Sequence, residues 1–151
     1  MEHERESPAE RLARLEDLEA IRRLFGEYRR HLDRKDFRGY AALFARAGEF
    51  IAGPGGSIRA TGPDAIFALV DGMRGSLLTD RDGDDLHVAL NEVIELDGDR
   101  ATASSTWLYI LRGEGDVPEL AKIGHYEDVL TREDGTWKFL RREAPTDIPA
   151  I

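Results

Sequence analysis

Residues 86–111 read LHVALNEVIELDGDRATASSTWLYIL and hold two long runs of β-type residues around one short turn. The runs 86–96 and 100–111 are rich in Val, Ile, Leu, Thr and aromatic side chains, and Asp97-Gly98-Asp99 between them is typical of a hairpin turn. A second hairpin is predicted downstream, with strands over 122–132 and 136–142. The C-terminal half is therefore predicted to form an antiparallel sheet.

The N-terminal half has the period of helices. Ser7-Pro8-Ala9-Glu10 is typical of a helix start, with a capping serine and a proline in the first turn. Apolar residues then recur every three or four positions, which predicts one long amphipathic helix ending near Asp33. Asp36 can cap a second helix, and Thr61-Gly62-Pro63-Asp64 can open a third. Residues 49–52 are a candidate for a short strand.

The predicted helices precede the long antiparallel strands along the chain, and this order is typical of an α+β domain. The helices must cover one face of such a sheet, and a strongly curved sheet with helices across its mouth forms a cone with an interior. The 151 residues suit a single domain, with its core expected at about residues 8–143. Residues 1–6 and 145–151 are predicted to be loose tails, and 112–121 a loop.

Composition excludes several classes of function. The net charge is −9, from 21 Lys and Arg against 30 Asp and Glu, which opposes nucleic-acid binding and docking on an anionic membrane. The absence of Cys excludes disulfides and thiolate chemistry, and the four dispersed His residues have no zinc spacing. Because neither a secretory signal nor a membrane-spanning apolar run is visible, a cytoplasmic protein is expected. Because no cluster of metal-ligating residues is apparent, neither a metal nor a cofactor is expected.

His87 is the most informative single residue, because an imidazole can accept a proton near neutral pH. Strict strand alternation places four residues on its face: His87, Ala89, Asn91 and Val93. The opposite face then holds Val88, Leu90, Ile94 and Leu96. The first, mixed face is of the kind expected to line a ligand pocket. The alternative is that His87 is a partly exposed residue at a strand start.

Asp33 falls five residues after Tyr28, where the long helix is predicted to end. Helix ends admit polar groups to a buried space, although Asp33 could equally belong to a charged surface run. Tyr28 lies on the apolar stripe, which favours core packing with its hydroxyl group bonded. His125 is less strongly indicated as a pocket residue, and His3 and His31 are predicted to be solvated.

An ordered series of segments resembles SnoaL-like proteins of the nuclear transport factor 2-like superfamily, which includes scytalone dehydratase, bile-acid 7α-dehydratase and polyketide cyclases. The series comprises Glu27–Phe37, Leu43-Phe44, Gly62–Ile66, His87–Asn91, Asp97–Ala101, Gly124–Asp128, Asp134–Phe139 and Arg142. It covers roughly residues 10–143. The resemblance implies a cystatin-like α+β barrel, in which three N-terminal helices close a cone-shaped antiparallel sheet. It also implies a homodimer, or a trimer.

In dehydratase-type members, the resemblance implies a site made of a helix Tyr, an Asp five residues later, a strand His and a late Arg. The matching residues, and hence the predicted catalytic residues, are Tyr28, Asp33, His87 and Arg142. The predicted substrate-binding residues are Trp107, His125, Tyr126, Phe139 and Arg141. Strict alternation favours Arg141 over Arg142 for the pocket, and only a β-bulge would reverse this. Scytalone dehydratase uses a second strand histidine where this chain has Thr106, which argues against the same substrate.

Two functions follow. The first is a cofactor-independent dehydratase, cyclase or isomerase, in which His87, oriented by Asp33, removes a proton from a small hydrophobic cyclic hydroxy or keto substrate. Tyr28 and one of the two arginines would stabilise the departing hydroxyl group or the developing oxyanion. The alternative is a non-catalytic binding or assembly module resembling the β subunits of ring-hydroxylating dioxygenases. An interior cavity that exposes both Asp33 and His87 favours the enzyme, and a filled cone favours the module.

Overall fold

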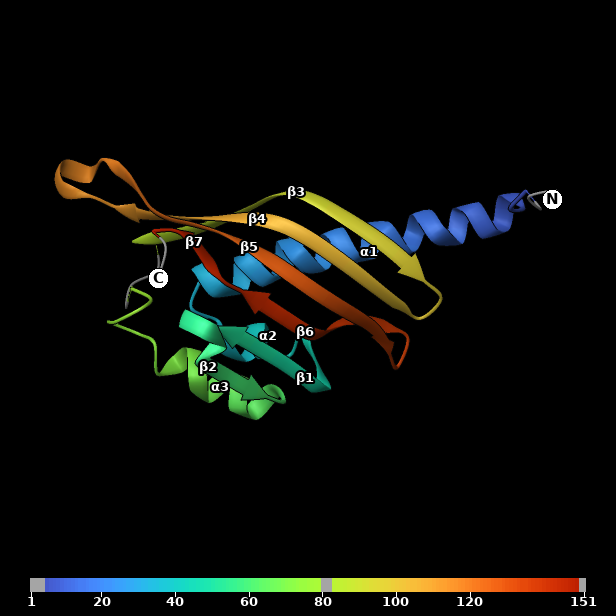
Figure 1. Cartoon of the computed structure of the whole chain (residues 1–151), viewed down its shortest axis with the longest axis horizontal. Helices are drawn as coiled ribbons and strands as arrows, with labels where there is room; N and C mark the ends of the chain where they lie inside the picture. The colour runs from blue at the N-terminus through green and yellow to red at the C-terminus, as the bar shows by residue number, and fades with distance from the viewer. Residues whose placement is uncertain (1–4, 80–82, 150–151) are drawn as a thin grey trace.

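The computed structural model describes residues 5–79 and 83–149, which form three α-helices and a curved seven-stranded sheet (Figure 1). The helices are α1 (Pro8–Asp33), α2 (Phe37–Ala41) and α3 (Pro63–Asp71), and short 3-10 turns lie at Pro54–Gly56 and Glu114–Asp116. The strands are β1 (Phe44–Ala52), β2 (Ile58–Thr61), β3 (Asp85–Asp97), β4 (Arg100–Arg112), β5 (Pro118–Glu133), β6 (Thr136–Ala144) and β7 (Thr146–Ile148). The predicted α+β class is confirmed.

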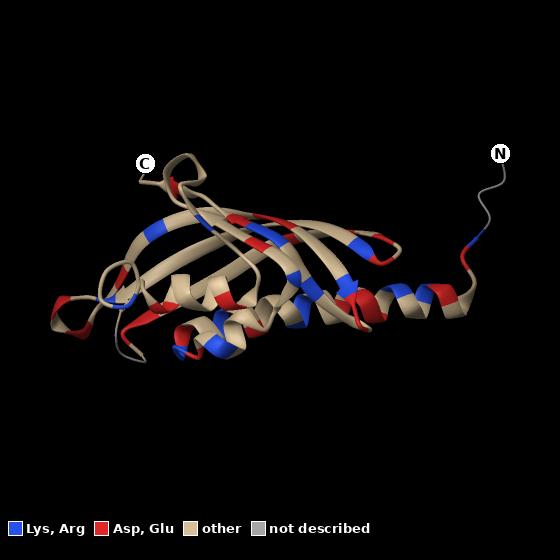
Figure 2. Cartoon of the chain, turned by 90° about the horizontal axis from the view of Figure 1, so that it is seen from below, with Lys and Arg blue, Asp and Glu red and all other residues tan. Residues whose placement is uncertain are grey.

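The strand order is β2-β1-β6-β5-β4-β3, with β7 added beside β5. The pairing of β1 with β6 is parallel and the other pairings are antiparallel. The sheet arches over the helices without closing, so β2 and β3 are its two free edges (Figures 1 and 2). α1 packs beneath the arch against β3, which brings the end of the long helix to the start of the first long strand.

The predicted start of α1 is confirmed. Ser7 Oγ accepts a hydrogen bond from the Glu10 backbone N–H, and the Glu10 carboxylate accepts one from the Ser7 N–H. The N-terminal half of α1 extends past the sheet (Figure 1), so Leu12 and Leu15 on the predicted apolar stripe are exposed. Only the C-terminal half of this helix therefore contributes its stripe to the core.

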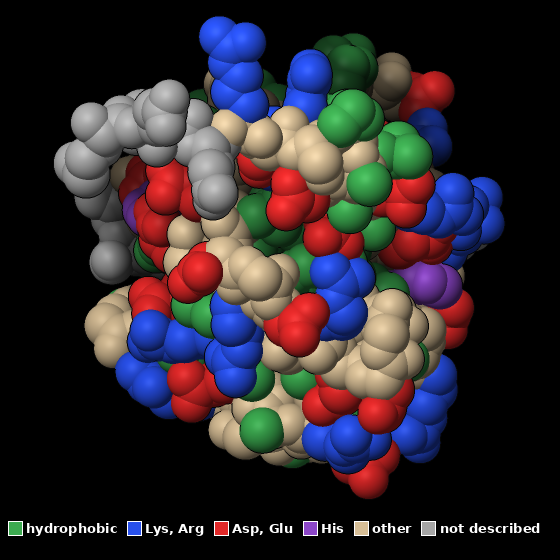
Figure 3. Space-filling view, turned by 90° about the vertical axis from the view of Figure 1, so that its right-hand side faces the viewer, with side chains coloured by type: hydrophobic (Ala, Val, Ile, Leu, Met, Phe, Trp, Pro, Cys, Tyr) green, Lys and Arg blue, Asp and Glu red, His purple; other side chains and the backbone are tan. Residues whose placement is uncertain are grey.

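Charges of both signs are interspersed over the surface. They alternate along α1 and at the strand ends in Figure 2, and hydrophobic side chains lie between them on the end face seen in Figure 3. Of the helices in the described part of the chain, none is long and apolar enough to cross a membrane.

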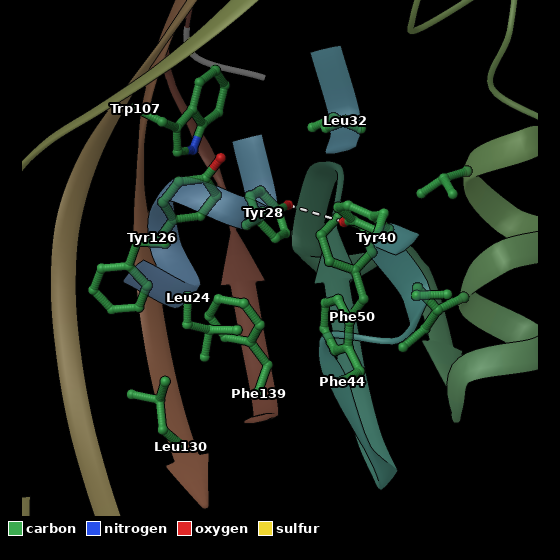
Figure 4. Packing of buried hydrophobic residues seen from close by; sticks show 14 of the residues in the cluster. Leu24, Tyr28, Leu32, Tyr40, Phe44, Phe50, Trp107, Tyr126, Leu130 and Phe139 are labelled. Carbon is green, nitrogen blue, oxygen red and sulfur yellow. Dashed lines mark hydrogen bonds between the residues drawn. The ribbon is translucent and has the colours of Figure 1, made fainter. Parts of the chain in front are cut away.

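The core beneath the sheet is largely aromatic (Figure 4). Phe139 of β6 is fully buried, and its ring lies 5.5 Å from that of Tyr28 and 5.3 Å from that of Phe44. These are the edge-on and tilted arrangements that aromatic pairs prefer. This packing fixes α1 and β1 on β6, and thereby the place where α1 ends.

A β-bulge in β3 corrects the predicted faces of that strand. Leu90 pairs with Thr106 but Val93 pairs with Ser104, and Asn91 adopts a left-handed conformation with φ of 59°. Beyond the bulge the alternation is reversed. Val93 therefore points outward, and the even-numbered Ile94 and Leu96 pack on the core instead of sharing a face with Val88 and Leu90.

The segment 145–149 is not the loose tail that the sequence predicts. Thr146–Ile148 forms β7, which pairs with β5 at Ile123 and Gly124. A Cβ atom at Gly124 would lie 2.2 Å from the Trp107 ring and 2.3 Å from the Pro145 carbonyl oxygen, so only glycine fits between them.

Three other boundaries differ from the prediction. β5 begins at Pro118 inside the expected loop, β1 begins five residues before Glu49, and β2 was not expected. The predictions for His3 and for the two ends of the chain beyond residues 5 and 149 lie outside the described residues.

Candidate functional site

The last residue of α1 is joined to the beginning of β3. Asp33 Oδ1 accepts hydrogen bonds from the backbone N–H of His87, at 2.9 Å, and from His87 Nδ1, at 2.8 Å. This geometry places a proton on Nδ1, so in the neutral ring it is Nε2 that carries the lone pair. The predicted contact between Asp33 and His87 is therefore present, with the ring in the tautomer that a general base needs.

The Asp33 carboxylate is largely withdrawn from solvent, with 7% of the residue exposed. Its second oxygen, Oδ2, is buried and lies 3.6 Å from Arg29 Nη1, one helical turn earlier. Asp33 is thus a buried anion that can stabilise positive charge on His87.

His87 lines an interior cavity of about 110 Å³ inside the cone. Other walls of this cavity are Tyr28, Leu32, Tyr40, Leu78, Trp107 and Tyr126, several of which are labelled in Figure 4. The structure therefore brings Tyr28, Trp107 and Tyr126 together with His87, as the resemblance implies. Asp33 reaches the cavity only through the imidazole, and Phe139 lies behind the walls in the core.

Tyr28 is held as a neutral phenol. Its hydroxyl oxygen accepts a hydrogen bond from the Tyr40 hydroxyl group at 2.9 Å (Figure 4). Burial raises the pKa of Tyr28, and the nearby Arg142 charge only partly offsets that effect. The Tyr126 hydroxyl group also hydrogen-bonds to Tyr28, and when both neighbours donate, the Tyr28 proton can be donated to a ligand oxygen.

Arg142 is buried under these tyrosines. Its Nε and Nη2 atoms each donate to Asp128 at 2.7 Å, and its guanidinium lies 3.7 Å from the Tyr126 ring centroid and 4.2 Å from that of Tyr28. Burial alone would lower the pKa of Arg142, but the Asp128 carboxylate raises it. The guanidinium does not line the cavity, so it acts on a ligand only through the tyrosines.

A bulge selects Arg142 over Arg141. Leu130 of β5 pairs with Phe139, whereas Val129 pairs with Arg141, which leaves Leu140 as the extra residue. Phe139 and Arg142 consequently face the same side of the sheet. Arg141 points to the other side, where it forms ion pairs with Glu49 and Glu143.

The predictions that place His125 and Arg141 in the pocket are corrected by this geometry. Alternation along β5 buries Tyr126 and turns His125 to the outer face, where its Nδ1 lies 2.7 Å from Asp147 Oδ2. The His125 side chain is 40% exposed. Neither residue lines the cavity that His87 lines.

Comparison with known proteins identifies the family of this fold. The family of SnoaL-like domains matches residues 13–143, which is most of the chain. This chain belongs to the SnoaL-like family. No curated protein matches it.

Three solved structures, all from Novosphingobium aromaticivorans, resemble this SnoaL-like domain. A candidate scytalone dehydratase is 32% identical, with a TM-score of 0.73 over 89% of this chain and 86% of the other. A nuclear transport factor 2-like protein with a cystatin-like fold is 27% identical, with a TM-score of 0.80 over 91% and 86%. The β subunit of a candidate aromatic-ring-hydroxylating dioxygenase is 16% identical, with a TM-score of 0.73 over 90% and 92%, and shows the fold alone.

The SnoaL-like domain also holds a buried charge cluster that sequence reasoning missed. Lys35 Nζ donates to Asp85 Oδ1, and the Tyr109 hydroxyl group donates to Asp85 Oδ2 at 2.8 Å. Burial opposes charge on Asp85, but these hydrogen bonds hold the pKa of its carboxyl group below the usual value. The Tyr109 ring lies 4.8 Å from the His87 ring, so the cluster supports the imidazole from behind.

One local signal could have found this cluster. Asp33 and Lys35 are two residues apart, as are Asp85 and His87. If the two segments run antiparallel, a contact of Asp33 with His87 therefore implies a contact of Lys35 with Asp85. No group of three or more His, Asp or Glu that could hold a metal ion occurs among residues 5–79 and 83–149.

Proposed function

We propose that this SnoaL-like domain is an enzyme for cofactor-independent proton abstraction: a dehydratase, cyclase or isomerase acting on a small hydrophobic cyclic hydroxy or keto substrate. One observation carries the proposal. His87 is oriented by a buried carboxylate through Nδ1, and it lines a cavity that Tyr28 also lines. The similarity to a candidate scytalone dehydratase supports the dehydratase class.

In this mechanism, His87 Nε2 takes a proton from the carbon next to a carbonyl group. Asp33 stabilises the imidazolium that forms. Tyr28 donates a hydrogen bond to the developing oxyanion or to the departing hydroxyl group, and in an elimination the proton held on His87 Nε2 passes to that hydroxyl group, which leaves as water. The largely apolar cavity walls lower the polarity around these groups and so strengthen the electrostatic interactions between them. Arg142 is a positioning residue, because its charge acts on Tyr28 and Tyr126 from below.

A binding or assembly module is the second candidate. The interior cavity is small compared with the roughly 300–1,000 Å³ of typical ligand pockets, and Asp33 does not line it. The fold is shared with a dioxygenase β subunit. A mass-spectrometric screen of hydroxylated ketones and steroids separates the two candidates: loss of water or isomerisation supports the enzyme, and thermal stabilisation by ligands without any turnover supports the module.

Replacing Tyr28 by phenylalanine is expected to lower turnover by about 10²–10³-fold, the usual effect of losing one oxyanion donor. The change also removes the hydrogen bond with Tyr40, so Tyr40→Phe is the matched control. It loses the same bond but keeps the Tyr28 hydroxyl group, and turnover should fall by less than about tenfold. If steady-state kinetics show that both variants lose the same amount of turnover, Tyr28 is not the oxyanion donor.

We also propose a homodimer formed through the outer face of the sheet. Leu108 and Ile110 on that face are only half-buried, and Val93 is exposed. An unpartnered apolar sheet face favours association. Light scattering at micromolar concentration should give twice the monomer mass, and Leu108→Glu combined with Ile110→Glu should give the monomer. A monomeric or trimeric mass for the unmodified protein contradicts this proposal.

A further inference from the structure

An open groove of about 510 Å³ runs between α1 and the free edge of β3. The helix contributes Arg22, Phe25, Gly26 and Arg29, which are spaced to lie on one face, and the strand contributes residues 86–90. Ser105 of β4 also lines it. Apolar walls with a few polar groups are the usual composition of a small-molecule site.

His87 borders both this groove and the interior cavity. Among the described residues, it is the one that lines both spaces. The interior cavity, at about 110 Å³, is smaller than typical ligand pockets, whereas the groove lies within their range of roughly 300–1,000 Å³. A molecule that reacts at His87 therefore has most of its available space on the groove side.

Gly26 keeps the helix wall of the groove open. Glycine within a helix is destabilising relative to alanine, yet a Cβ atom at Gly26 would meet nothing within 4 Å. Close packing therefore does not explain a glycine here. Its consequence is a gap on α1 between Arg22 and Arg29, opposite the edge of β3.

Ser105 supplies an unsatisfied polar group. The residue is 6% exposed, and its Oγ atom is buried without a hydrogen-bond partner among the described residues. Buried hydroxyl groups are normally hydrogen-bonded, because leaving one unpaired is costly. That oxygen has almost no accessible surface, so a ligand in the groove meets the wall that Ser105 forms and not its hydroxyl oxygen.

Two cations stand at the rim. Arg22 lies 3.4 Å from Glu92, and Arg29 lies 3.6 Å from Asp33. Both arginine side chains are about half exposed, and these contacts are longer than charge-assisted hydrogen bonds. Arg29 already interacts with Asp33, which holds His87. Arg22 lies seven residues earlier on α1, which corresponds to about 10 Å at a rise of 1.5 Å per residue. An anionic group displacing Glu92 could form a closer, bidentate contact with Arg22.

We propose that the α1–β3 groove is a binding site for an elongated apolar molecule with an anionic end. The anion pairs with Arg22, the apolar body lies along the wall formed by Phe25, Gly26 and β3, and the far end reaches His87. The substrate class this implies, an apolar ring system with an acidic tail, rests on the proposed function. The binding site itself does not.

The test uses two fluorescent probes of nearly equal shape, anilinonaphthalene sulfonate and the uncharged phenylnaphthylamine. The sulfonate should bind saturably and more tightly than the neutral probe. Gly26→Leu fills the groove and should lower the binding affinity for both probes by about tenfold or more. Gly26→Ala should weaken them less while raising the melting temperature by about 2–4 °C, as expected for alanine in a helix.

The charge contribution is tested by Arg22→Ala, with Arg23→Ala as the matched control on the solvent side of α1. Arg22→Ala should lower the affinity for the sulfonate probe by about tenfold, since one charge-assisted contact is lost, and leave the affinity for the neutral probe unchanged. Arg23→Ala should change neither. Wild-type binding in Gly26→Leu, or equal effects of the two arginine variants, overturns the groove site.

Failure of this site and failure of the enzyme are distinguishable. If the binding losses occur but no substrate is turned over, the site stands and the enzyme does not. If turnover is found and Gly26→Leu binds both probes normally, the enzyme stands and the groove site does not.

Discussion

Replacing His87 by glutamine is expected to lower turnover by about 10²–10⁴-fold, the contribution of a positioned general base. Glutamine keeps most of the polar volume, but its amide cannot accept a proton at neutral pH. Little apolar surface is lost, so the melting temperature should stay within a few degrees of the wild type. Steady-state kinetics and a thermal melt of the same preparation measure both effects.

The matched control is His125→Gln. His125 has the same side chain and also contacts a carboxylate, but it lies on the outer face of the sheet, away from the cavity. This variant should retain wild-type turnover. If both histidine variants lose activity equally, or if His87→Gln retains full activity, the Asp33–His87 pair is not the catalytic base.

Replacing Arg142 by methionine is expected to destabilise the fold by about 3–5 kcal/mol, the usual cost of removing one partner of a buried ion pair. Both members of the pair are almost fully buried, with side-chain exposures of 1% for Arg142 and 0% for Asp128. The change leaves the Asp128 carboxylate without its partner beneath Tyr28 and Tyr126. Urea denaturation measures the loss, a large fraction of the roughly 5–15 kcal/mol that stabilises a typical domain.

Two further variants give this prediction its controls. Arg141→Met removes an exposed arginine and should change the free energy of unfolding by about 0.5 kcal/mol or less. Combining Arg142→Met with Asp128→Leu removes both charges and should recover most of the stability. A loss below about 1 kcal/mol for Arg142→Met alone would contradict a structural role for the buried pair.

Local sequence patterns were sufficient to predict the long elements of the fold. The capping residues at Ser7 and Asp36, the helical period of α1 and the two hairpin turns depend on neighbouring residues, and each is present in the structure. β2 and the start of β1 were missed because their pairing with each other and with β6 connects distant segments.

The orientation of individual site residues was harder to predict. One extra residue at a bulge reverses every side chain beyond it, so alternation from Phe139 chose Arg141 and alternation from His87 placed Val93 inside. The contact of Lys35 with Asp85 joins residues 50 positions apart. On its own such a lysine looks like a solvated one, and the equal spacing of Asp33 to Lys35 and of Asp85 to His87 becomes informative only once Asp33 is paired with His87.

The contact of Asp33 with His87 was predictable only through the resemblance to the family. Without that resemblance, Asp33 could be either a pocket residue at the helix end or one charge in a surface segment. The structure explains how it turns inward: Asp33 is the last residue of α1, and Lys35 follows with φ of 57°, which redirects the chain back towards the core.

The central claim is that His87 removes a proton from a carbon next to a carbonyl group, and deuterium exchange tests it without requiring the full reaction. Ketones that stabilise the protein against heat would be incubated with it in deuterium oxide and followed by proton NMR. We predict that the wild-type protein exchanges the proton next to the carbonyl group and that His87→Gln does not. Exchange at equal rates by both proteins, or none by the wild type on any bound ketone, would contradict the account.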